Sequence, residues 1–304
     1  MNLNKVNNKY RRGGYRDRFG PHRLMMLPAV ILFSVFFLIP FLQGVYMAFT
    51  NWNGFSKMDF IGLDNFVYFF KDRRAKTAVT NTLFYGISCT LLLNFVGLAL
   101  ALVFEGKMRG KGVMRTIMYL PVIISPLIMG YIWKFILSSE NGVILDTLQK
   151  LKADFLYRDW LGNPKQALVV IVLVYVWQNI GGNMLIYLAG LQTIDDQVLE
   201  SAQIDGANAL QILWRIKLPL LTSSLRINII TSIIGSMSIF DIIVSLTNGG
   251  PGYTTESLSQ FVYRQSTSGQ AGYSAAVALI LFVAILIPVI LAFMAMRRMY
   301  VEEE

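Results

Sequence analysis

Residues 200–219 read ESAQIDGANALQILWRIKLP, a short polar stretch between two long apolar ones. Apolar stretches of that length on both sides indicate membrane-spanning helices, so the polar stretch is a loop between two of them. Gly206 can take the left-handed conformation that ends one helix and lets the chain reverse. A second short helix then carries Leu210, Leu213 and Trp214 on one face. The loop is therefore predicted to be a helix–turn–helix on the membrane surface, with apolar side chains available to a partner.

The two ends of this loop also carry helix signals. Thr193 or Asp195 can cap the first helix, for which residues 198–205 would give about two turns. Pro219 lacks an N–H donor and suits the first turn of the membrane helix that follows. From these features alone, an ordinary pair of amphipathic interfacial helices is an alternative interpretation.

The composition of the whole chain agrees with a membrane protein. Of the 304 residues, 55% are hydrophobic and 15% are charged, whereas soluble domains usually carry about 25% charged residues. The net charge is +9, but the basic residues flank apolar segments, so they indicate membrane orientation. No nucleic-acid-binding module is recognisable, and no nucleic-acid partner is expected.

Apolar runs long enough to span a bilayer occur six times, which predicts an all-α, polytopic bundle of six transmembrane helices in the lipid bilayer. The basic segment 1–23 favours a cytoplasmic N-terminus, and six spans return the acidic end, residues 302–304, to the same side. The first run is too long for a signal peptide and has no cleavage site, so it is expected to be retained. The six runs are residues 24–49, 79–104, 115–138, 166–190, 222–246 and 272–296.

Few residues of the chain could bind a metal, form a disulfide or couple transport to an ion gradient. The single histidine, His22, lies in the basic tail, and the single cysteine, Cys89, lies inside an apolar run. Neither a metal site nor an intrachain disulfide is expected from them. Asp241 is the only acid well inside a span, and an isolated acid is a poor coupling site for an ion gradient.

Polar residues inside spans usually face a cavity or another helix, so those of the fourth and fifth spans are candidates for a solute path. Amides and hydroxyls beside an aromatic ring would suit a sugar. The alternative for the serines and glycines is close helix packing, and sequence alone does not separate the two interpretations. The path candidates are Asn179, Asn183, Ser232, Gly235, Ser236, Ile239 and Phe240.

Taken together, these residues resemble the maltose-type sugar permeases of bacterial ABC importers over nearly the whole chain. In that family the loop at 200–219 is the "EAA" coupling loop, in which Ser201 replaces a commoner alanine. The matching elements elsewhere are Trp52 with GLDN at 62–65, Asn81-Thr82, Leu120-Pro121, AGLQ at 189–192, Phe240-Asp241 and LTNGGP at 246–251.

The resemblance implies a permease domain over residues 24–301 with a coupling loop at about 193–219 that docks into an ATPase subunit. It also implies a second, non-identical permease, two ABC ATPase subunits and an extracytoplasmic solute-binding protein as partners, in the bacterial cytoplasmic membrane. The coupling residues it implies are Glu200, Ser201, Ala202, Asp205, Gly206, Ala207, Ile216, Leu218 and Pro219.

This chain is not expected to be an enzyme or to hold a cofactor. Gly112 follows Lys111 where a phosphate-binding loop needs Ser or Thr for magnesium, so ATP and Mg²⁺ are expected on the partner ATPases. The function implied is import of a sugar, expected to be an oligosaccharide, by alternating access. One alternative is a permease for glycerol phosphate or another polar solute, disfavoured because no Arg or Lys is buried in the fourth or fifth span. A second is an ion-coupled secondary transporter, which would show inverted repeats and paired intramembrane charges.

Overall fold

The computed structural model describes residues 21–55, 57–106, 109–140, 142–152 and 158–300. Within these ranges the regular structure is helical, apart from one isolated bridge between Thr50 and Phe60. The predicted all-α class is confirmed. The helices are α1 Pro21–Phe33, the π-helical turn η2 Ser34–Leu38, α2 Ile39–Met47, α3 Asp64–Lys71, α4 Arg73–Glu105, α5 Lys111–Ile123, α6 Pro126–Ile136, α7 Val143–Lys150, α8 Pro164–Leu191, α9 Asp196–Ile204, α10 Ala209–Ile212, the π-helical turn η4 Leu213–Lys217, α11 Leu218–Leu220, α12 Thr222–Met237, α13 Asp241–Leu246, α14 Leu258–Thr267 and α15 Ala271–Tyr300.

Four of the described helices are long and apolar enough to cross a membrane: Met26–Met47, Arg73–Glu105, Pro164–Leu191 and Ala271–Met296. They correspond to the first, second, fourth and sixth predicted spans. Two further pairs of helices satisfy the same criterion only when each pair is joined across a bend. The number six therefore holds if each bent pair is one span, and it stays a prediction.

The third predicted span, residues 115–138, is bent by 98° between α5 and α6. Pro126 begins α6, and a proline disfavours helical geometry in the residue before it. Ser125 accordingly has ψ 132°. The bend frees the carbonyl of Ile124, which accepts a hydrogen bond of 2.9 Å from Nε2 of the buried Gln178 on α8.

The fifth predicted span, residues 222–246, is not one helix, so that prediction is wrong. Residues 238–240 separate α12 from α13, and Phe240 leaves the helical region with φ −137° and ψ −63°. The carbonyl of Ile239 accepts a hydrogen bond of 2.7 Å from Oγ of Ser257. A side chain from the following loop thus replaces a helical hydrogen bond, and such replacements let broken helices lie in a protein interior.

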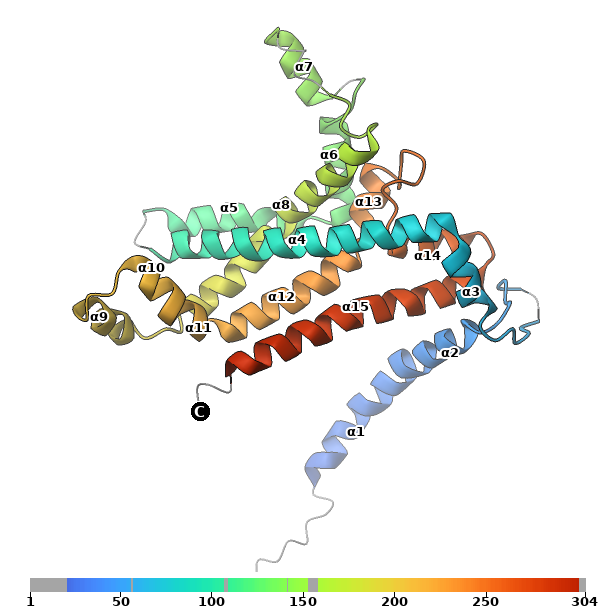
Figure 1. The fold of residues 1–304 in the computed structure, drawn as a ribbon, viewed down its shortest axis with the longest axis horizontal. Coiled ribbons are helices and arrows are strands. Elements are labelled where there is room, and N and C mark those ends of the chain that lie inside the picture. The colour runs from blue at the N-terminus through green and yellow to red at the C-terminus, as the bar shows by residue number, and fades with distance from the viewer. Residues whose placement is uncertain (1–20, 56, 107–108, 141, 153–157, 301–304) are drawn as a thin grey trace, which may run out of the picture.

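Helix α4 is the axis of the bundle, and α8 and α12 pack along it (Figure 1). Three clusters of buried apolar residues follow α4 from one end to the other. The first joins it to α3, α14 and α15, the second to α8 and α13, and the third to α8 near the end that bears α9 and α10. The end with α3 and α14 is called the outer end below, and the end with α9 and α10 the inner end.

Two glycines allow helices to approach closely. A Cβ on Gly181 of α8 would overlap the main-chain oxygen of Met118 on α5, and a Cβ on Gly130 of α6 would overlap the side chain of Ser245 on α13. Small residues at such crossings are typical of membrane helix interfaces. The second contact joins the parts of the third and fifth predicted spans that lie beyond their breaks.

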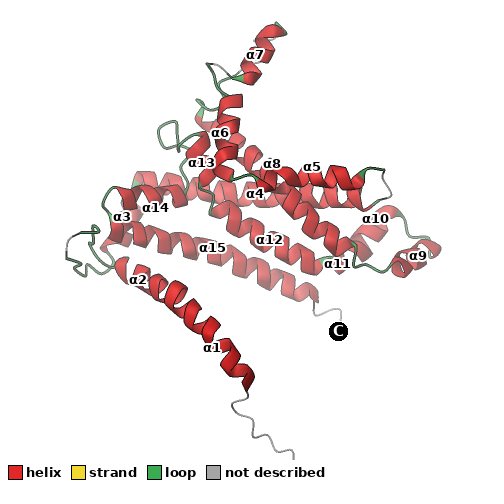
Figure 2. Cartoon of the chain, turned by 180° about the vertical axis from the view of Figure 1, so that it is seen from behind, coloured by secondary structure: helices red, strands yellow, loops and turns green. Residues whose placement is uncertain are grey.

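Helix α1 leads away from the bundle, whereas α2 rests against α15 (Figures 1 and 2). Helix α7 projects in another direction beyond α6. Nearly all of the predicted basic tail, 1–23, and the acidic end, 302–304, lie outside the described residues.

Candidate coupling surface and transport path

The helix–turn–helix predicted at the inner end is present. Oδ1 of Asp195 accepts a hydrogen bond of 2.9 Å from the main-chain N of Gln197 and caps α9. Gly206 follows α9 with φ +80°, the left-handed conformation expected of it. Asn208 and Gln211 then cap α10 reciprocally, each side chain accepting from the other's main-chain N–H at 2.9 and 2.8 Å. The polar residues of the loop therefore fix both short helices locally.

The end of the loop differs from the prediction. Pro219 lies in the first turn of the short α11 and not in that of the long α12. The segment Ala209–Leu220 meets α12 at an angle of 72°, and Leu221 at the bend has ψ 4°. Because Leu221 is buried against α4 and α8, the bend lets one apolar side chain anchor the loop to the bundle.

Three large apolar side chains of the loop are exposed among its polar residues. Ile204, Leu210 and Trp214 are 86%, 67% and 67% exposed. Leu210 and Trp214 were predicted to be available to a partner, whereas Ile204 was not singled out. Leu213 is instead half-buried and lines a cleft between the loop and α4. An apolar patch of this kind at a membrane protein's inner end is typical of an interaction site.

The predicted coupling residues occupy several positions on this loop. Glu200 and Ser201 are exposed on α9, and the Glu200 carboxylate makes no hydrogen bond or ion pair with the described residues. Four predicted residues meet in one hollow of about 240 Å³ between the turn that follows α9 and the segment of α10 and η4, while Ala202, Leu218 and Pro219 lie outside its lining. The residues lining the hollow are Asp205, Gly206, Ala207, Gln211, Arg215 and Ile216.

An ion pair that sequence analysis missed joins the loop to the bundle. Nζ of Lys217 lies 2.5 Å from Oε2 of Glu105, the last residue of α4, and both side chains are largely shielded from solvent. Position 105 directly follows the second predicted span, 79–104, and position 217 lies 112 residues later. No local pattern connects them, so the pairing required the fold.

The path candidates on α8 and α12 are mostly engaged in helix packing. Nδ2 of Asn183 donates to Oγ of Ser232 at 2.9 Å, and Asn228 donates to the carbonyl of Asn183 at 3.1 Å. The fully buried Ser236 donates to the carbonyl of Ser232 at 2.6 Å. These contacts supply the packing role that sequence analysis left open for the serines.

The other candidates lie around the same helices. Asn179 is half-buried and donates to the carbonyl of Tyr175, one turn earlier in α8, at 2.9 Å. A Cβ on Gly235 would lie 2.7 Å from the Tyr175 hydroxyl oxygen. Ile239 is buried in the central cluster, and Phe240 is half-buried beside Tyr263. The candidates with some exposure are therefore Asn179, Asn183, Gly235 and Phe240.

One sequence-based argument needs correction. An anionic solute was disfavoured because no base was found buried in the fourth or fifth span, yet Arg226 is half-buried in α12. Its guanidinium carbon lies 5.5 Å from the ring centroid of Phe293 on α15. The guanidinium therefore packs toward α15, but a base is present in the inner half of this helix.

Comparison with known proteins identifies the class. Residues 94–300 match the family described as the binding-protein-dependent transport system inner membrane component. The chain belongs to this family, and it is accordingly a permease, the membrane component of an ABC transport system, and not itself a catalytic subunit.

Two relatives match nearly end to end. The chain is 33% identical to AmyD of Thermoanaerobacterium thermosulfurigenes, named a probable starch degradation products transport system permease, over 90% of this chain and 94% of AmyD. It is 31% identical to MsmF of Streptococcus mutans, a multiple sugar-binding transport system permease, over 94% of each chain. A crystal structure of a bacterial ABC transporter involved in the import of the acidic polysaccharide alginate matches with a TM-score of 0.80 and 26% identity, over 91% of this chain and 95% of that one.

Proposed function

We propose that this chain is one permease of an ATP-driven importer that carries a sugar, specifically an oligosaccharide, across the bacterial cytoplasmic membrane by alternating access. The relatives' names support the substrate class, because AmyD is named for starch degradation products and MsmF for multiple sugars. The alginate transporter has also been crystallised in complex with a pentasaccharide-bound periplasmic protein. An extracytoplasmic binding protein is accordingly the proposed donor of the solute.

The remaining partners are a second, non-identical permease and two ABC ATPase subunits, which would hold ATP and Mg²⁺. The observation that carries the coupling proposal is the exposure of Ile204, Leu210 and Trp214 on the same loop as the exposed Glu200 carboxylate, which has no partner among the described residues. This combination fits docking into an apolar cleft that offers a hydrogen-bond donor. The inner end then faces the cytoplasm, and both termini lie on that side.

The coupling role is tested by ATP hydrolysis in the assembled complex, comparing Glu200→Gln with the control Asp196→Asn. Both residues are exposed acids of α9. Losing a hydrogen bond to a charged group should lower stimulation by the loaded binding protein about tenfold in Glu200→Gln. The control should behave as wild type. Equal stimulation in the two variants would contradict the proposed docking role of Glu200.

A second candidate solute is glycerol phosphate. UgpA of Agrobacterium fabrum, an sn-glycerol-3-phosphate permease, is 30% identical over 92% of this chain and 94% of UgpA, and Arg226 supplies a base in α12. The same hydrolysis measurement with maltotriose, an alginate pentasaccharide and sn-glycerol-3-phosphate decides between them. Stimulation by the glycerol phosphate alone would replace the sugar proposal.

A further inference from the structure

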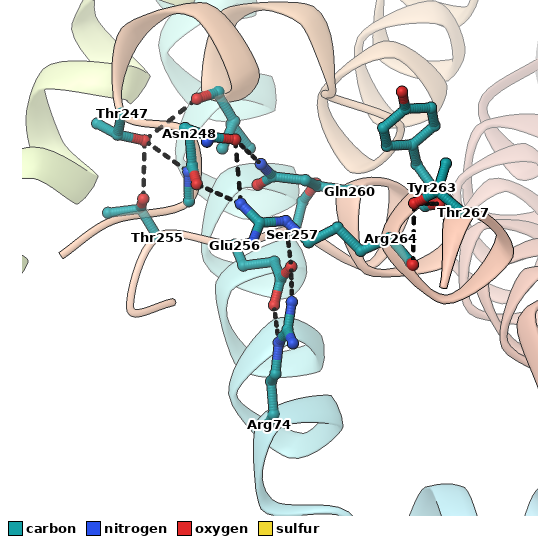
Figure 3. A network of polar contacts seen from close by, with 12 residues as sticks. Arg74, Thr247, Asn248, Thr255, Glu256, Ser257, Gln260, Tyr263, Arg264 and Thr267 are labelled. Atoms are coloured by element: carbon teal, nitrogen blue, oxygen red, sulfur yellow. Dashed lines mark hydrogen bonds and ion pairs between the residues drawn. The ribbon is translucent and has the colours of Figure 1, made fainter. Parts of the chain in front are cut away.

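Residues 254–258, here called the outer clasp, contain a carboxylate that no sequence motif singled out. Glu256 is 0% exposed. It accepts two hydrogen bonds from Arg74 at the start of α4, Nε to Oε2 at 2.6 Å and Nη2 to Oε1 at 2.7 Å. Nε of Arg264 on α14 lies 3.3 Å from the same Oε1. Figure 3 shows this carboxylate between the two guanidinium groups.

The main chain of the clasp is held by α4 as well. Nδ2 of Asn81 donates to the carbonyls of both Thr254 and Glu256, at 2.8 and 2.9 Å. The main-chain N of Leu258 donates to Oγ1 of Thr82 at 2.8 Å. Three main-chain groups of the clasp are therefore bonded to side chains of α4, in addition to the Glu256 carboxylate.

The clasp also holds the break in the fifth span. Oγ of the buried Ser257 donates to the Ile239 carbonyl, the group freed between α12 and α13. On the far side of this break, the ring of Phe240 packs against Tyr263 of α14, with centroids 5.3 Å apart. The break therefore contacts both the clasp and the helix that follows it.

The loop before the clasp belongs to the same unit. Arg264 donates through Nη2 to the carbonyl of Asn248 at 2.5 Å and to its Oδ1 at 3.0 Å. The Arg74 guanidinium lies 3.7 Å from the ring centroid of Tyr253, which is partly exposed at the outer end. A force on this exposed loop would reach Glu256 through both arginines, because a buried carboxylate cannot give up its charged partners cheaply.

We propose that the outer clasp transmits displacement of the outer end to the α12–α13 break, with Glu256 and Ser257 as positioning residues. The inference rests on the proposed function, since the partner that would press on the outer end is the solute-binding protein. In this arrangement Glu256 fixes the clasp to α4 and α14. Ser257 couples the position of the clasp to the main chain at Ile239 through its hydrogen bond. Residues 238–240, which form the break and include Phe240, then move with the loop as well as with α12, the helix that precedes them.

The first test compares Ser257→Ala with Ser259→Ala in the complete transporter. Ser259 is two residues away and partly exposed, and its side chain makes no hydrogen bond with the described residues. With maltotriose-loaded binding protein, Ser257→Ala should lose about fivefold of the stimulation over basal hydrolysis, the effect of losing the hydrogen bond to the Ile239 carbonyl. Basal hydrolysis and complex yield should match wild type, and Ser259→Ala should match it throughout. Wild-type stimulation in Ser257→Ala would overturn the proposal.

A second measurement does not depend on the binding protein. Hydrogen exchange of peptides covering 236–244 and 254–260 is followed in the purified complex, for wild type, Ser257→Ala and Glu256→Gln. Oγ of Ser257 also accepts a hydrogen bond of 3.3 Å from the main-chain N of Gln260 and caps α14, so both variants should speed exchange at 254–260. The proposal requires that both variants also speed exchange at 236–244. If 236–244 exchanges at the wild-type rate in both variants, the clasp does not hold the break and the proposal fails.

The two measurements also separate failure of this inference from failure of the proposed function. If the wild-type complex shows no stimulation by any loaded binding protein, the importer proposal fails, and the exchange rates still decide whether the clasp controls the break. If wild type is stimulated and Ser257→Ala is stimulated equally, only the clasp proposal fails.

Discussion

Replacing Gln178 by leucine should destabilise the bend between α5 and α6. Nε2 of Gln178 donates to the Ile124 carbonyl, which lies where the helical ladder is interrupted. Leaving a buried carbonyl without a donor costs about 1–3 kcal/mol. Oε1 of Gln178, however, is itself buried without a hydrogen-bond partner among the described residues, and leucine removes that cost. Because this gain offsets part of the loss, the expected net loss is at the low end of that range, about 1 kcal/mol.

The measurement is the thermal transition of the purified complex in lipid nanodiscs. A loss of that size should lower Tm by about 2–4 °C, the shift per kcal/mol for domains of this size. Asn179→Leu is the matched control, because Asn179 donates only to a carbonyl of its own helix. If Gln178→Leu is as stable as the control, the side chain does not stabilise the bend and the reasoning is refuted.

Two further predictions concern single contacts. Glu105→Gln and Lys217→Met should show a coupling of about 1 kcal/mol in a double-mutant cycle on Tm, because their ion pair is largely shielded; strictly additive effects would contradict it. Gly181→Ala should cost about 3 kcal/mol and reduce assembly, because the new methyl group overlaps the main chain of α5, which cannot rotate away. Gly182→Ala, whose methyl meets only one side-chain carbon at 4.0 Å, is its control, and comparable losses in both would contradict the packing argument.

Local features could be predicted from the sequence because interactions between residues close in the chain determine them. Gly206 was expected to be left-handed and Asp195 to cap a helix, and both are observed. The apolar runs likewise placed four single helices, since a run of about 20 apolar residues has few other stable states. The bend before Pro126 follows from the steric effect of that proline on its neighbour.

The break after Met237 could not be predicted in the same way. Nothing in residues 222–246 prevents a continuous helix, because the segment contains no proline. The hydrogen bond that compensates the break comes from Ser257, 18 residues beyond Ile239. The Arg74–Glu256 pair spans 182 residues, and Glu256 has no local feature that distinguishes it from a surface acid. Both depend on tertiary contacts that no periodicity encodes.

The break between α5 and α6 and the break between α12 and α13 are built in the same way, which determines how the helix angle at a break can change. At each one, the freed carbonyl is satisfied by a polar side chain, Gln178 for Ile124 and Ser257 for Ile239. The parts beyond the breaks, α6 and α13, pack on each other. At the second break, the neighbouring main-chain hydrogen bonds each belong to one side, Ser238 to Ile234 before it and Val244 to Phe240 after it. A change of angle at this break therefore leaves both helical ladders intact. Its energetic cost falls on one side-chain hydrogen bond, on the contact of Phe240 with Tyr263 and on the packing of α13 against α4, α6 and α8.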